Sequence, residues 1–162
     1  MKKITIICVV FMLFSCVNLP EFTAQVKFDK ETFLEQRQLW QQSNIKNYQY
    51  QLSAIGFIYY YGKILVENGK IKNDIPSVEN SNIENFMNYS TIDDIYKAIE
   101  EMFDSFNNTK QSKKNVYCTE IKVEYDKMKH IPIDIIYSYY SPSDVVHDGT
   151  FRYKITEFSK KN

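Results

Sequence analysis

The chain contains little of what most catalytic and metal sites require. Its 162 residues include two histidines, three cysteines and four glycines. It has no glycine-rich phosphate loop, no G-x-S-x-G nucleophile segment and no H-E-x-x-H metal segment. These absences make an enzyme a weaker hypothesis than a binding protein, and no cofactor is predicted.

An excess of charge of either sign is also missing. Twenty basic residues balance twenty acidic ones, and no polybasic segment occurs. Nucleic-acid-binding domains and proteins held on anionic lipid by charge alone need such an excess. The composition therefore excludes nucleic acid as an expected partner.

The sequence lacks the run of about 20 apolar residues that crosses a bilayer. Its longest apolar stretch, residues 4–14, is shorter and follows the basic pair Lys2 and Lys3. A basic start followed by a short apolar run is typical of a secretory signal peptide, predicted here over residues 1–15.

Leu13-Phe14-Ser15-Cys16 follows the apolar run and resembles the lipobox of bacterial lipoproteins, in which the cysteine is diacylated. Two acyl chains suffice for stable anchoring without a transmembrane helix. Ordinary cleavage near Ser15, leaving a free thiol, is the alternative. The resemblance implies an exported protein anchored through Cys16, and Val17 resembles the outer-membrane class, facing the periplasm. Residues 16–27 are predicted to be a tether.

Cys118 is the one thiol left after removal of the signal peptide and acylation of Cys16, so no intramolecular disulfide is expected. It lies in YCTEIKVEYD, a segment that alternates between two faces as a strand does. A strand residue is favoured over a nucleophile, because no basic group adjoins it in sequence.

Hydrophobic periodicity predicts two helices and five strands in the order α-β-β-α-β-β-β. The first helix follows Asp29 and ends near Ser43, and the second covers TIDDIYKAIEEMFDSF with Thr91 as its cap. Residues 48–54 alternate as a strand, and Asn68-Gly69 is a hairpin turn signal. Three further strands are predicted at residues 117–126, 133–140 and 151–158.

This order predicts an α+β fold built as a two-layer sandwich, with an antiparallel sheet and both amphipathic helices on one face. The predicted tether ends at residue 27. Residues 28–162 are therefore predicted to form a single domain.

Several segments resemble, in the right order, a family of small exported bacterial proteins known as domain of unknown function number 6174. The match rests on Trp40, Tyr48-x-Tyr50, Val66 to Lys70, TIDDIYKAIEE, Val123 to Asp126 and Pro132. No activity is established for that family. The resemblance implies a fold and a compartment, not a reaction.

Tyrosines cluster at two predicted strand ends and are the main candidate binding residues: Tyr59, Tyr60, Tyr61, Tyr137, Tyr139 and Tyr140. Tyrosine gives large amphipathic contact area at low entropic cost. The alternative is that tyrosines simply suit half-buried strands. The clusters favour a non-catalytic module, one form being an inhibitor, that binds an envelope protein or a small ligand.

Two alternatives to this hypothesis stay open. One is a purely structural envelope lipoprotein. The other is a metal-dependent binder or enzyme using Asp144, His147 and Asp148, although a calcium or zinc site normally needs more ligands and a polar loop is favoured. His130 lies in a predicted turn.

Overall fold

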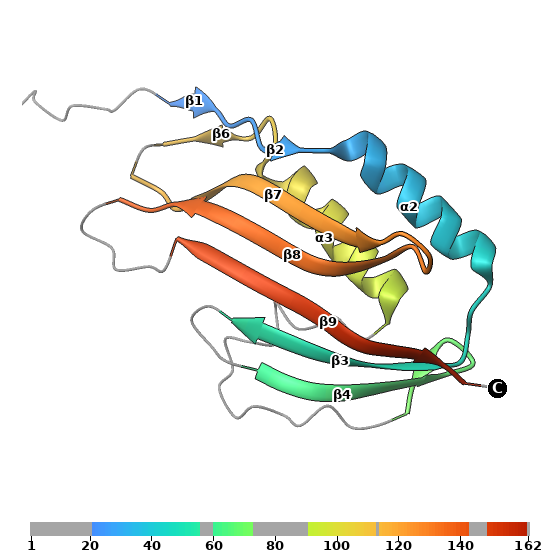
Figure 1. The fold of residues 1–162 in the computed structure, drawn as a ribbon. Helices are drawn as coiled ribbons and strands as arrows, with labels where there is room; N and C mark the ends of the chain where they lie inside the picture. Colours follow the sequence, from blue (N-terminus) through green and yellow to red (C-terminus); the bar gives the residue numbers. More distant parts are fainter. Residues whose placement is uncertain (1–20, 56–59, 73–90, 113, 143–148, 162) are drawn as a thin grey trace, which may run out of the picture.

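The structure is a computed structural model that describes residues 21–55, 60–72, 91–112, 114–142 and 149–161. It contains two helices and nine strands within these ranges (Figure 1). In chain order they are β1 Phe22–Thr23, β2 Lys27–Phe28, α2 Lys30–Ser43, β3 Tyr48–Ile55, β4 Tyr60–Glu67, β5 Lys70–Ile71, α3 Ile92–Phe106, β6 Lys110–Gln111, β7 Tyr117–Asp126, β8 Ile131–Tyr140 and β9 Thr150–Lys160.

Seven strands form one large sheet in the order β2-β7-β8-β9-β3-β4-β5, and β1 pairs with β6 in a separate two-stranded sheet. All neighbouring strands are antiparallel except β2 and β7, which are parallel. The long hairpin β7–β8 turns at one end of the sheet, and the chain enters through β1 at the other (Figure 1).

The mixed α and β class predicted from the sequence is confirmed, with both predicted helices and the turn at Asn68 and Gly69, each of which has positive φ. The observed order contains additional two-residue strands, β1, β2, β5 and β6. Two residues cannot produce a period-2 pattern, so the sequence analysis missed β1, β2 and β6. The prediction of a wholly antiparallel sheet was wrong at β2.

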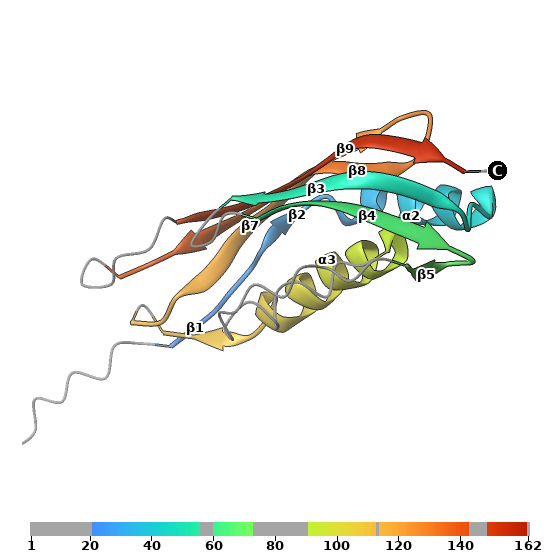
Figure 2. The ribbon, with the colours of Figure 1, turned by 90° about the horizontal axis from the view of Figure 1, so that it is seen from below.

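Both helices lie on the same side of the large sheet (Figure 2). Helix α3 buries Ile92, Ile95, Tyr96 and Ile99. Its first turn is closed by a capping box, in which the Thr91 hydroxyl accepts from the Asp94 amide and the Asp94 carboxylate accepts from the Thr91 amide. The buried side chains of α3 make the core between the helices and the sheet apolar and aromatic.

Residues 21–27 are part of the fold, which corrects the predicted tether over residues 16–27. Ala24 and Val26 are buried, at 2% and 8% exposure. The Ala24 amide donates to the carbonyl of Thr109 at 3.0 Å, and the Val26 amide donates to the Asn107 side-chain oxygen at 3.1 Å. The domain therefore begins before residue 28, because this segment satisfies its polar groups against the end of α3.

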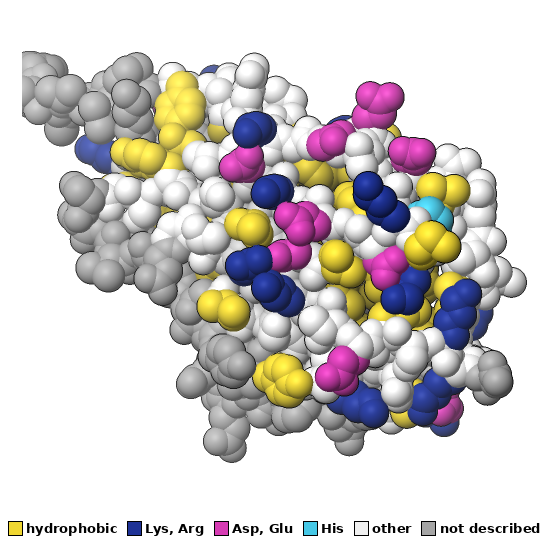
Figure 3. Space-filling model, viewed as in Figure 1, with side chains coloured by type: hydrophobic (Ala, Val, Ile, Leu, Met, Phe, Trp, Pro, Cys, Tyr) yellow, Lys and Arg dark blue, Asp and Glu magenta, His cyan; other side chains and the backbone are white. Residues whose placement is uncertain are grey.

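The face of the sheet opposite the helices carries interspersed charges of both signs (Figure 3). At its centre, Arg152 donates through Nε to the two oxygens of Asp134 at 2.8 and 3.1 Å and also contacts that carboxylate through Nη2. Asp134 is itself buried. Among the described residues of this face, charged side chains of both signs are interspersed with apolar ones (Figure 3).

Candidate functional site

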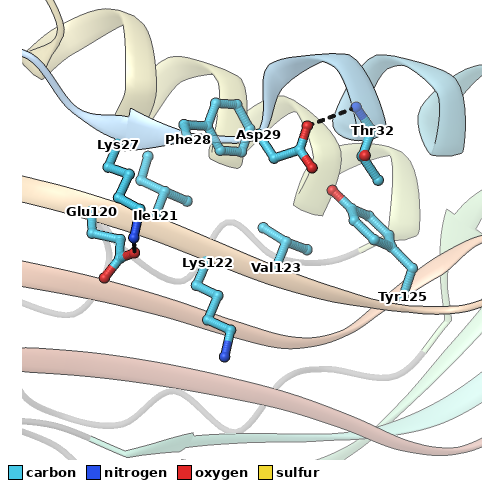
Figure 4. A pocket seen from close by; sticks show the side chains of 9 residues that line it. All are labelled: Lys27, Phe28, Asp29, Thr32, Glu120, Ile121, Lys122, Val123 and Tyr125. Atoms are coloured by element: carbon cyan, nitrogen blue, oxygen red, sulfur yellow. Dashed lines mark hydrogen bonds and ion pairs between the residues drawn. The ribbon is translucent and has the colours of Figure 1, made fainter.

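A groove of about 340 Å³ lies between strand β7, strand β2 and the first turn of helix α2 (Figure 4). Lys27 and Glu120 stand at one end of its lining, and Thr32 and Tyr125 stand at the other. Phe28, Ile121 and Val123 add apolar surface. The groove thus combines a hydrophobic lining with polar groups at both ends.

Beside this groove, one edge of β7 is largely unpaired within the described part of the chain. Strand β2 pairs only with Glu120 and Ile121, because the chain then turns away at Asp29 into α2. Residues 122–126 have β8 on their other side, and no strand of the described residues pairs with them on this one. An unpaired strand edge offers backbone donors and acceptors to an added strand.

The charged groups of the groove are already partly engaged. Lys27 Nζ lies 2.8 Å from Glu120 Oε1, and its hydrogen bond holds the pKa of Glu120 below its usual value. Asp29 accepts from the Thr32 amide at 3.1 Å as the cap of α2, which lowers the pKa of its carboxyl group. The Lys122 ammonium, 3.7 Å from Glu124, remains largely exposed and accessible to an anionic group.

The hydroxyl of Tyr125 is buried and has no hydrogen-bond partner among the described residues. Burial, followed by the nearby Asp29 carboxylate, raises the pKa of Tyr125, so the hydroxyl keeps its proton at neutral pH. Its ring stacks on Tyr96 at a centroid distance of 6.4 Å, which fixes its position. An unsatisfied buried hydroxyl costs about 1–3 kcal/mol, so Tyr125 reduces the stability of the fold at this position.

Tyr137 and Tyr139 do not belong to an exposed recognition surface, contrary to the sequence-based hypothesis. Tyr137 is 1% exposed in the core, and Tyr139 is half-buried with its hydroxyl 3.7 Å from the sulfur of Met102. Both lie on the helix-facing side of β8. Tyr140 is exposed on the opposite side and stacks on Tyr117 at 5.0 Å.

Tyr61 is the most exposed of the predicted tyrosines whose side chains the structure describes, at 59%. It is the second residue of β4 and lies at the same end of the sheet as Tyr140 (Figure 1). Three strand spacings separate β4 from β8, or about 14 Å. The structure therefore does not bring the two predicted tyrosine clusters together.

The remaining predicted site residues lie outside the described residues: Cys16, Tyr59, Asp144, His147 and Asp148. The side chain of Tyr60 is likewise not described. In the ranges that the structure covers, no group of three or more histidine, cysteine, aspartate or glutamate side chains is placed to hold a metal ion.

Cys118 is not an activated nucleophile. Burial raises the pKa of its thiol to about 11, and the side chain is fully buried in β7, so it is a protonated core residue at neutral pH. His130 occupies the β7–β8 turn with positive φ, and its Nδ1 lies 3.0 Å from the Gln36 side-chain oxygen. These groups hold structure together and offer no visible acid–base pair.

Sequence reasoning missed the groove because the groove depends on tertiary placement. Asp29 was identified as the residue before the first helix, but nothing in the sequence shows that Lys27 and Phe28, just before it, form a strand beside β7. The one available signal was the alternation of residues 117–126, which placed Ile121, Val123 and Tyr125 on one face. It could not show that this strand lies near an edge.

Neither helix in the described part of the chain is both long and apolar enough to cross a membrane. A model described as "Family of unknown function (DUF6174)" matches residues 32–160, so the chain belongs to that family, as the resemblance predicted. No match was found among curated proteins or among solved structures.

Proposed function

We propose that this protein is a non-catalytic binding module of the cell envelope, exported and held on the membrane by acylation of Cys16, that binds an extended segment of a partner protein. A two-layer α+β scaffold, with the helices stiffening one face of the sheet, positions the site. The single observation that carries this proposal is the groove of about 340 Å³ beside the unpaired edge of β7.

An extended peptide fits this place better than a compact ligand, because the edge itself supplies main-chain hydrogen bonds. Strand addition of this kind takes affinity from the backbone and specificity from pockets for alternate side chains. Here Ile121 and Val123 give apolar contact. Lys122 favours an acidic side chain in the ligand.

Panning a random peptide library against the intact domain tests the site. In the variant Thr32→Trp, an indole replaces a small side chain in the groove lining while the Asp29 cap, which uses the residue 32 amide, is retained. Peptides selected on the unmodified protein should lose binding to this variant.

Gln38→Trp is the matched control, because Gln38 is an exposed residue of the same helix and is not part of the groove lining. Selected peptides should bind this variant unchanged. Equal binding to both variants, or no enriched peptide, would remove the groove as the binding site.

The anchor is tested separately from the groove. The full chain, expressed in a bacterial host fed an alkyne-labelled fatty acid, should incorporate label and float with membranes. Cys16→Ala should do neither. Unchanged labelling of that variant would contradict acylation at this residue while leaving the groove result untouched.

A further inference from the structure

Three aromatic rings form a continuous row at the end of the sheet where the chain enters the fold. Phe22 of β1 meets Tyr117 of β7 edge-on at 5.2 Å, and Tyr117 stacks on Tyr140 of β8 at 5.0 Å. Val116, which directly precedes Tyr117 in the chain, is 37% exposed, and Tyr140 is exposed to the same extent. We call these four residues, Phe22, Val116, Tyr117 and Tyr140, the anchor-end patch.

The position of the first folded residues sets how far this patch can be from the membrane. Because β1 is packed against β6, only the residues from Cys16 to Glu21 connect the acylation site to the fold. The six residue steps from Cys16 to Phe22 span at most roughly 22 Å when fully extended. Strand β7 alone, with ten residues, is about 34 Å long. The connection therefore keeps the chain-entry end of the domain within roughly 22 Å of the acylation site, a distance shorter than β7 itself.

We propose that the anchor-end patch is a membrane-contact surface that seats this end of the domain in the lipid–water interface. The inference rests on the acylation of Cys16 in the proposed function. Its occupant is the bilayer that holds the acyl chains, since the short connection keeps that surface within reach of the patch.

The chemistry of the patch suits an interface between water and hydrocarbon. Tyrosine places an apolar ring and a polar hydroxyl at the level of the headgroups, where aromatic residues gather in membrane proteins. Lys110 and Lys114 are exposed nearby in the chain, and each lysine close to an anionic lipid surface strengthens association about fivefold. Glu21, on the connection itself, acts in the opposite direction.

The opposite end of the sheet supplies an internal control. Met128 is 88% exposed in the β7–β8 turn, which lies far from the chain entry in both ribbon views (Figures 1 and 2). It is apolar and exposed, but no anchor lies near it. A contact that depends on hydrophobicity alone would not distinguish the two ends.

The test compares Tyr140→Trp with Met128→Trp in the acylated full chain. Each protein is reconstituted into vesicles of phosphatidylethanolamine and phosphatidylglycerol that contain lipids brominated near the ester linkage. The native Trp40 is 2% exposed in the core and gives the same background in both proteins. Emission from position 140 should be quenched, and emission from position 128 should match that of the unmodified chain.

Equal quenching at both positions, or none at position 140 in a protein whose acyl chains are verified by mass spectrometry, would overturn the proposal. Absence of the acyl chains would overturn the anchor as well, and the mass measurement separates that failure from the first.

Adding Lys110→Glu and Lys114→Glu to Tyr140→Trp should reduce quenching in anionic vesicles and leave it unchanged in neutral ones. Equal quenching in both would exclude the lysines from the contact.

Discussion

The tyrosines of the helix-facing side of the sheet and those at its anchor end are the same residue type in two opposite situations. Tyr48, Tyr50 and Tyr137 are at most 1% exposed, whereas Tyr61 and Tyr140 are 59% and 37% exposed. The buried tyrosines pack in the hydrophobic core together with aliphatic residues. The exposed group contributes little to the core and is available for contacts outside the domain.

In two buried tyrosines, Tyr48 and Tyr96, the hydroxyl also makes a hydrogen bond that joins parts of the structure. The amide of Ile92, at the start of α3, donates to the Tyr48 hydroxyl at 2.9 Å in a buried position. The Tyr96 hydroxyl donates to the carbonyl of His130 at 2.8 Å and so ties α3 to the β7–β8 turn. Tyr48 and Tyr96 are tolerated in buried positions because their hydroxyls meet backbone groups that lack partners in regular structure.

Alkaline pH should give the largest separation between the two groups. Burial raises the pKa of Tyr48 to about 12 and also raises the pKa values of Tyr96, Tyr125 and Tyr139. In the unfolded chain tyrosine loses its proton near pH 10. Above that pH the unfolded state binds fewer protons than the folded state, so the free energy of unfolding falls as pH rises.

The stabilisation from these protonated tyrosines is complete below about pH 10 and, for Tyr48, is lost between about pH 10 and 12. We expect circular dichroism to show cooperative unfolding in this interval, with the buried phenolates appearing in the ultraviolet spectrum at the same time. Ionisation of all thirteen tyrosines near pH 10 with an unchanged circular dichroism signal would contradict this assignment.

Truncation of one tyrosine from each group should give the next largest effect. Tyr137→Ala removes a buried ring from the core and should lower the free energy of unfolding by about 3–5 kcal/mol. Tyr140→Ala removes a cross-strand pair with Tyr117 and should cost only about 0.2–1 kcal/mol. Urea denaturation of both variants measures the difference, and equal losses would mean that the two positions are equally buried in solution.

Removal of a single hydroxyl should separate the groups by a smaller amount. Tyr48→Phe keeps the ring and leaves the Ile92 amide without its acceptor, so it should cost about 1–3 kcal/mol in urea denaturation. Tyr117→Phe is the matched control, because no backbone amide among the described residues donates to the phenolic oxygen of Tyr117. If the two variants are equally stable, the Tyr48 hydroxyl does not cap α3.

The sequence was sufficient to predict the helices and strands whose hydrophobic pattern repeats many times. The apolar stripe of α3 with its Thr91 cap and the alternation of β3 predicted their elements correctly, because each pattern repeats over several turns or pleats. Strand β2 could not be predicted in this way, since its two residues are a strand only by contact with β7. The groove, which depends on that contact, was invisible for the same reason.

The tyrosines of β8 show a different limit. Alternation places Tyr137 on one face and Tyr140 on the other, so the sequence could separate them. It could not tell which face the helices would cover, because Ile135 and Ile136 give both faces an apolar neighbour. Grouping Tyr137 with Tyr140 as one recognition surface followed from chain proximity, and burial corrects it.

The smallest predicted change in stability sharpens the comparison within the exposed group. Tyr61→Ser and Tyr140→Ser should each alter the free energy of unfolding by less than about 1 kcal/mol, since neither ring belongs to the core. Their effects at the membrane should differ, because Tyr140 belongs to the anchor-end patch whereas Tyr61 lies about 14 Å away across three strand spacings. With a reporter Phe22→Trp in the acylated chain, Tyr140→Ser should reduce quenching by brominated lipid and Tyr61→Ser should not. If Tyr61→Ser alone reduced quenching, the membrane would contact the β4 side of this end of the sheet, and the row of rings from Phe22 to Tyr140 would face water.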